Sequence, residues 1–293
     1  MFDFPGDAPT SFDRLRDDLE HSVRKRIDLP REHQAVTVEG DAWPHGSLLR
    51  VLTTGGTVEV DDTTGGLPDE LKPPTLARGR TPGPRFETFV VEAEPLVADV
   101  AGGGRLPLHL RVDGQHVGFD FGRDVNGTTV MAPASGDAVA VVGVERDDLL
   151  RVVKTKATSE AAARGVTLSR VEADVSSPDA RTLLVTGKIG GTKKVAFFNA
   201  SFLIDFAIDF VAEADPTGEL VGRVRDVKLR GDGTIMNLLL SLATPVIDKA
   251  KRRPLPLRDV LAMAGVQGLK LRDVAVQAGD RLELRATFGD AGP

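Results

Sequence analysis

Histidine and carboxylate side chains are the groups in this sequence that could hold a metal ion or transfer a proton. The chain has no cysteine, so thiolate chemistry and cysteine-ligated metals are excluded. The five histidines lack metal-ligand spacing, and His109 with His116 across an Asp113-Gly114 hairpin turn is better explained as a surface pair. Asp205 and Asp209 share one strand face and could hold a cation, but a solvated outer face explains them more simply. We expect no metal site and no cofactor.

Motifs that carry catalysis are also missing. The sequence contains no Gly-x-Ser-x-Gly nucleophile elbow. The segment Gly187 to Lys193 has glycines and lysines without the order of a phosphate-binding loop, so it predicts a hairpin turn. No paired carboxylates suited to acid–base chemistry stand out between Asp137 and Asp148. We therefore expect a protein that is not an enzyme.

Composition excludes further classes of function. A net charge of -6 opposes the neutralisation of phosphates by which proteins bind nucleic acids, and one tryptophan with no tyrosine supplies few base-stacking surfaces. No apolar run approaches the roughly 20 residues that span a bilayer. The N-terminus lacks the features of a signal peptide, so the chain as given is expected to be cytoplasmic, with export expected if a leader has been trimmed.

The most informative segment runs from Lys193 to Val211. Apolar residues occupy every second position, a period that indicates a strand and not a helix. About 15 residues at roughly 3.3 Å each make a strand near 50 Å long, which must twist and curl. One face of this strand must bury a row of aromatic and branched side chains: Phe198, Ala200, Phe202, Ile204, Phe206, Ile208 and Phe210.

Helical spacing provides a partner for that row. Apolar residues at steps of three and four predict a long helix over 234–252, kinked by Pro245, with further helices over 11–27 and 145–164. A final hairpin is expected from 269–276 and 281–288. The predicted fold class is α+β, a long, highly curved antiparallel sheet wrapped around long amphipathic helices. The chain is expected to form one elongated domain over 1–293, with a β-rich half at 1–143 and a helix-plus-long-strand half at 144–293.

The C-terminal half of the sequence resembles a known family of proteins. The apolar helix ending in Arg-Arg-Pro-Leu-Pro-Leu, followed by Leu-Lys-Leu-Arg-Asp-Val-Ala-Val and Asp-Arg-Leu-Glu-Leu-Arg-Ala, resembles the tubular lipid-binding superfamily over roughly 145–288. That superfamily includes the bactericidal/permeability-increasing proteins, the synaptotagmin-like mitochondrial-lipid-binding domains and bacterial phospholipid-binding relatives. The resemblance implies that lipid lies in a seam between sheet and helix. The expected seam residues are Phe198, Phe202, Ile204, Phe206, Ile208, Phe210, Leu238, Leu242 and Val246, and the head-group candidates are Lys249, Lys251, Arg252 and Arg253.

Two outcomes of this arrangement stay open. If sheet and helix meet fully, the apolar residues form a packed core, and the charges at the helix end serve solubility. If sheet and helix stand apart, the gap suits non-covalent binding or transport of a lipid or another elongated apolar small molecule, with transient contact to a membrane surface. The alternative function is a structural or assembly protein, in which a partner chain or a second copy covers the apolar strand and helix faces.

Overall fold

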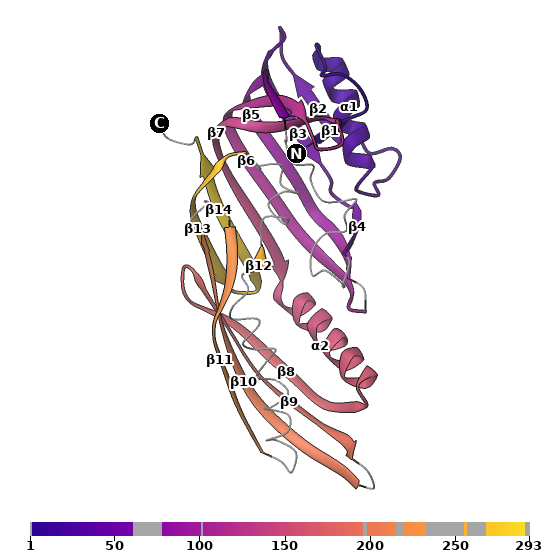
Figure 1. Cartoon of the computed structure of the whole chain (residues 1–293), viewed down its shortest axis with the longest axis vertical. Helices are drawn as coiled ribbons and strands as arrows, with labels where there is room; N and C mark the ends of the chain where they lie inside the picture. Colours follow the sequence, from indigo (N-terminus) through magenta and orange to yellow (C-terminus); the bar gives the residue numbers. More distant parts are fainter. Residues whose placement is uncertain are drawn as a thin grey trace.

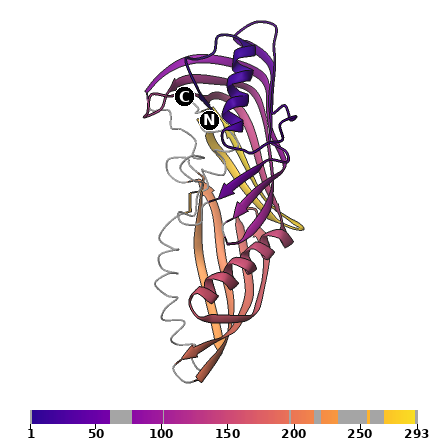
Figure 2. The same cartoon turned by 90° about the vertical axis from the view of Figure 1, so that its right-hand side faces the viewer.

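In the residues that it describes, the structure, a computed structural model, has two β-sheets and two helices in an elongated molecule (Figures 1 and 2). It describes residues 2–60, 78–100, 102–195, 198–214, 220–232, 255–256 and 268–290. The first sheet contains β1 (Phe2–Phe4), β2 (Val36–Glu39), β3 (His45–Leu52), β4 (Thr57–Val60), β5 (Arg78–Val100), β6 (Gly104–Arg123), β7 (Thr129–Glu145), β13 (Lys270–Ala278) and β14 (Arg281–Gly289). The second contains β8 (Val166–Asp179), β9 (Thr182–Val195), β10 (Phe198–Ala214), β11 (Leu220–Asp232) and β12 (Leu255–Pro256).

The predicted fold class is wrong. Strands make up 68% of the described residues, and the two helices lie beside the sheets instead of forming a centre that a sheet wraps. The first sheet is also mixed, because β3 and β4 run parallel to β5. The physical reason is that alternating sequence dominates from 78 to 145 and again from 166 to 232, so most apolar side chains are committed to sheet faces. The helix predicted over 234–252 lies outside the described residues.

The first sheet carries the main core. Helix α1 (Phe12–Arg24) begins at Ser11, whose Oγ accepts a hydrogen bond from the backbone N–H of Arg14, as a helix N-cap should. Leu15 and Leu19 on its apolar side are fully buried. Beneath them the ring of Phe89 meets that of Phe119 edge to face, with centroids 5.4 Å apart. Helix and sheet thus form two closely packed layers.

An ion-pair cluster ties the N-terminal strand to this helix. The carboxylate of Asp3 in β1 accepts a 2.7 Å hydrogen bond from Ser22 Oγ and pairs with Arg26 at 2.6 Å and Lys25 at 3.0 Å. Burial alone would raise the pKa of Asp3, but the Ser22 hydrogen bond and the two cations together outweigh it and lower the pKa to about 2. Asp3 therefore stabilises the attachment of β1 to α1 while it is ionised.

The turn expected at Asp113-Gly114 is wrong. Both residues lie inside β6, which pairs with β5 on one side and β7 on the other. A central strand paired along both edges overrides a local turn signal of two residues. A methyl group added to Gly114 would lie 2.8 Å from Val117 Cγ2, so glycine serves close packing here. His109 and His116 consequently lie along one strand, about 23 Å apart at roughly 3.3 Å per residue.

The two sheets meet at the turn between β8 and β9. The backbone N–H of Val276 in β13 donates to the carbonyl of Ala180 at 2.7 Å, and the N–H of Ala278 donates to Ser177 Oγ at 3.0 Å. Arg181 forms an ion pair with Asp273 at 3.1 Å. The β8–β9 turn therefore covers an edge of the first sheet that would otherwise present free donors.

The expected C-terminal hairpin is confirmed as β13 and β14. It pairs with β7, so it completes the first sheet although β8 to β12 intervene in the chain. Helix α2 (Arg146–Ala163) connects β7 to β8 and lies beside the β8 edge of the second sheet (Figures 1 and 2). Gly165, with φ of 70°, takes the left-handed conformation just after it. Neither of the helices in the described ranges has the length and apolar character needed to cross a membrane.

Candidate functional site: the apolar face of the second sheet

The strand predicted over Lys193 to Val211 is confirmed from Phe198 onward as β10, whereas Lys193 to Val195 form the end of β9. It pairs antiparallel with β9 on one side and β11 on the other, and residues at every second position share a face of the sheet. Phe206 is directly opposite Gly187 and Leu229, and Ile208 is directly opposite Val185 and Val227. The predicted row of β10 side chains from Ala200 to Phe210 therefore does occupy one face.

The neighbouring strands extend this face with residues that the sequence analysis did not single out. In the register of the sheet, directly opposed residues point to the same side. Ile189 pairs with Ile204 on β10 and with Val171 on β8. Alternation within each strand was the signal that could have identified them. We define the apolar face by Val166, Leu168, Val171, Ala173, Val175, Leu183, Val185, Ile189, Ala200, Phe202, Ile204, Phe206, Ile208, Phe210, Val224, Val227 and Leu229.

The opposite face of the same sheet carries the charges, arranged as cross-strand and along-strand ion pairs. Lys188 meets Asp205 at 3.4 Å, and Arg225 meets Asp209 at 2.7 Å. Each aspartate is thus held by its own basic partner, which favours the interpretation as a solvated face over a shared cation. Arg170 hydrogen-bonds Glu172 and lowers the pKa of that carboxyl group. This face is built to remain ionised in water.

Two phenylalanine rings of the apolar face lie across glycines of adjacent strands. A methyl group added to Gly187 would lie 2.6 Å from Cζ of Phe206, and one added to Gly222 would collide with the ring of Phe210. The expected turn at Gly187 to Lys193 is therefore wrong, because the whole segment lies within β9 and Gly187 makes room for a β10 side chain. A phenylalanine ring placed against a glycine of the adjacent strand shields the backbone there.

Burial differs along this face. Ala200 and Phe202 are buried, with 2% and 8% of their surface exposed, and they form a small cluster with the half-buried Ile189 and Ile204. Phe206, Ile208 and Phe210 are half-buried. Side chains that keep part of their apolar surface accessible can gain further contacts from a ligand.

The other predicted site residues stand as follows. Phe198 begins β10, and its side chain is not among those described. The predicted helix residues and head-group candidates lie outside the described residues: Leu238, Leu242, Val246, Lys249, Lys251, Arg252 and Arg253. Of the seam set, the structure thus brings together the members on β10 from Phe202 to Phe210.

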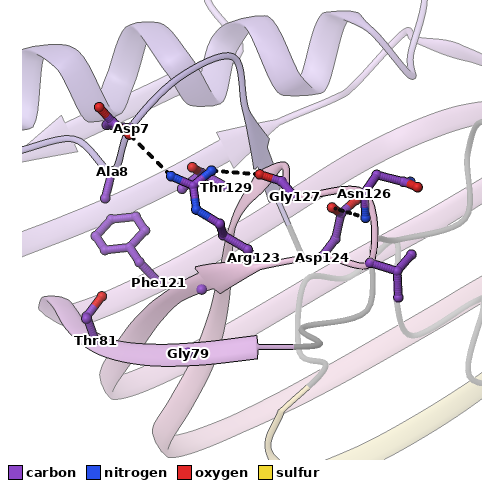
Figure 3. Close-up of a pocket in the computed structure, with 12 residues that line it drawn as sticks. Asp7, Ala8, Gly79, Thr81, Phe121, Arg123, Asp124, Asn126, Gly127 and Thr129 are labelled. Atoms are coloured by element: carbon purple, nitrogen blue, oxygen red, sulfur yellow. Dashed lines mark hydrogen bonds and ion pairs between the residues drawn. The ribbon is translucent and has the colours of Figure 1, made fainter.

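Three surface cavities lined by described residues lie away from the apolar face. The first, of about 690 Å³, lies at the turn between β6 and β7, where Arg123 pairs with Asp7 at 3.3 Å and donates to the carbonyl of Gly127 at 2.7 Å (Figure 3). Because its polar groups bond to one another, we do not place the functional site there. The second, about 510 Å³, lies beside Trp43 and His116, and the third, about 410 Å³, lies at the junction of the sheets near Ala180. Across the described ranges, no three acidic or histidine side chains group closely enough to hold a metal ion.

Comparisons with protein families, curated proteins and solved structures find no match for this chain.

Proposed function

We propose that this protein binds a lipid or another elongated apolar molecule along the apolar face of the second sheet, without catalysing a reaction. The observation that carries the proposal is the continuity of that face over β8, β9, β10 and β11, together with its half-buried phenylalanine and isoleucine side chains. The charged opposite face supports it, because it leaves the apolar side as the surface suited to an apolar ligand.

The dimensions of the face suit an acyl chain. From Ala200 to Phe210 the strand advances about 33 Å at roughly 3.3 Å per residue. Two acyl chains end to end make up a bilayer core of about 30 Å, so a single chain fits within this length. Each methylene removed from water contributes ~0.8 kcal/mol, and a dozen therefore contribute on the order of 10 kcal/mol before the cost of ordering the chain.

Organic extraction of the purified protein, followed by mass analysis of the extract, tests the proposal. Phe206→Asp should remove the co-purifying lipid, because it places a carboxylate among the apolar side chains. The matched control is Ala207→Asp, which adds the same group to the opposite face of the same strand, across from Lys228. Lipid retention should survive in this control.

If a folded Phe206→Asp variant retained as much lipid as the unmodified protein, the proposal would be contradicted. An extract free of lipid, from a protein that native mass spectrometry shows to be a stable oligomer, would favour the assembly alternative instead. Folding of both variants is checked by circular dichroism and thermal unfolding.

A further inference from the structure

A single charged side chain interrupts the apolar face. Lys193 of β9 is directly opposite Ala200 of β10 and Val166 of β8, so all three residues point to the same side of the sheet. On the described strands of this face, Lys193 is the only residue that carries a charge. Lys194, the next residue, is directly opposite Asn199 and points to the charged face.

The surroundings of Lys193 are apolar. Ala200 is 2% exposed and belongs to the small cluster against which Val166 also packs. Lys193 is half-buried, whereas Lys194 is exposed. Among the residues that the structure describes, no carboxylate forms an ion pair with Lys193, although most basic residues on the opposite face have one. A half-buried ammonium without an anion is a group that a ligand can satisfy.

The position of Lys193 sets a direction for the ligand. Strand β9 ends at the end of the molecule farthest from the first sheet (Figure 1), and Lys193 lies two residues before the last residue of β9. From there the apolar row runs through Phe202 and Phe206 toward Phe210, near the junction with the first sheet. One end of the face is therefore cationic and the remainder is apolar. This arrangement is complementary to a ligand with an anionic head and an apolar tail.

We propose that the ligand is a long-chain fatty acid, bound with its carboxylate at Lys193 and its hydrocarbon chain along the half-buried Ile204, Phe206 and Ile208. This inference rests on the proposed function and specifies its ligand class. One cation matches one negative charge, and the described strands of this face offer no carboxylate for the cationic part of a zwitterionic head group. A fatty acid meets both conditions with a single chain.

The test compares oleate with oleyl alcohol, which has the same chain without the charge, in calorimetric titrations below the aggregation concentration of either ligand. Lys193→Gln should weaken oleate binding about tenfold or more, the effect of losing one charge-assisted hydrogen bond. It should leave the binding of oleyl alcohol within about twofold, since the apolar contacts remain. Lys194→Gln is the matched control and should leave both ligands unaffected, whereas Lys193→Arg should retain oleate binding.

The outcomes separate this inference from the proposed function. If the unmodified protein binds neither oleate nor oleyl alcohol, the proposed function fails. If it binds both equally well and Lys193→Gln changes neither, apolar binding stands and the role of Lys193 is overturned. Equal losses of oleate affinity in Lys193→Gln and Lys194→Gln would show an unspecific charge effect and would also overturn the role of Lys193. Binding of phosphatidylglycerol vesicles without binding of oleate would overturn it as well. Should Lys193→Gln fail to fold, Lys193→Met provides the same comparison.

Discussion

The two sheets use the same alternating pattern of apolar residues with different results. In the first sheet, Phe89 and Phe119 are 0% and 2% exposed, because α1 and the surrounding strands enclose them. In the second sheet, Phe206 and Phe210 are half-buried, although Val175, Ala200 and Phe202 on the same face are buried. Alternation therefore decides which side of a sheet is apolar, whereas the layer packed against that side decides whether it becomes a core.

The largest expected effect comes from truncating the core of the first sheet. Phe89→Ala removes a fully buried ring and its edge-to-face contact with Phe119, so it should lower the free energy of unfolding by about 3–5 kcal/mol. Urea unfolding followed by circular dichroism measures the change. Val125→Ala, at a site 81% exposed, is the control and should have no measurable effect. If Phe89→Ala lowered the free energy of unfolding by less than about 1 kcal/mol, the first sheet would not have the closed core that the comparison assigns to it.

The next effect depends on pH and belongs to the attachment of β1 to α1. The pKa of Asp3 is about 2 in the folded protein, below its ordinary value of 3.8. The stabilisation that ionised Asp3 provides is therefore fully present at pH values above 3.8 and is lost as the pH falls toward 2. Between pH 5 and pH 2 the unmodified protein should lose about 1–2 kcal/mol more than Asp3→Asn does. Parallel pH profiles of the two proteins would refute this role of Asp3.

The smallest effect is expected in the second sheet. Phe206→Ala removes a half-buried ring lying over Gly187 and should lower the free energy of unfolding by only about 1 kcal/mol. The same urea titration measures it beside Phe89→Ala. A loss of about 3 kcal/mol or more would instead place Phe206 in a closed core, and the apolar face would then serve stability and not binding.

Much of the local structure could be predicted from the sequence. The helix expected over 11–27, the strand alternation from Phe198 to Phe210 and the final hairpin depend on neighbours within a few positions, and the structure confirms each, the helix as Phe12–Arg24. Asp113-Gly114 was misleading because pairing along both edges of β6 outweighs the preference of two residues for a turn. The parallel pairing of β3 with β5 involves segments far apart in the chain, and no local pattern encodes it.

The candidate site was only partly predictable for the same reason. The β10 row follows from period-two spacing in one segment, so its shared face could be anticipated. The isolation of Lys193 could not, since it depends on which residues of β8 and β10 oppose it in the register of the folded sheet. In the sequence Lys193 is one of two adjacent lysines, and only strand pairing separates their environments.

The return of the C-terminal hairpin to β7 affects the order in which the chain can fold during synthesis. Residues 138–145 of β7 pair with residues 281–288 of β14. A ribosome adds about 5–20 residues per second, so β7 must wait several seconds for this neighbour. During that interval the unpaired edge of β7 is exposed to other nascent chains, and a chaperone that shields it would improve the yield of folded protein.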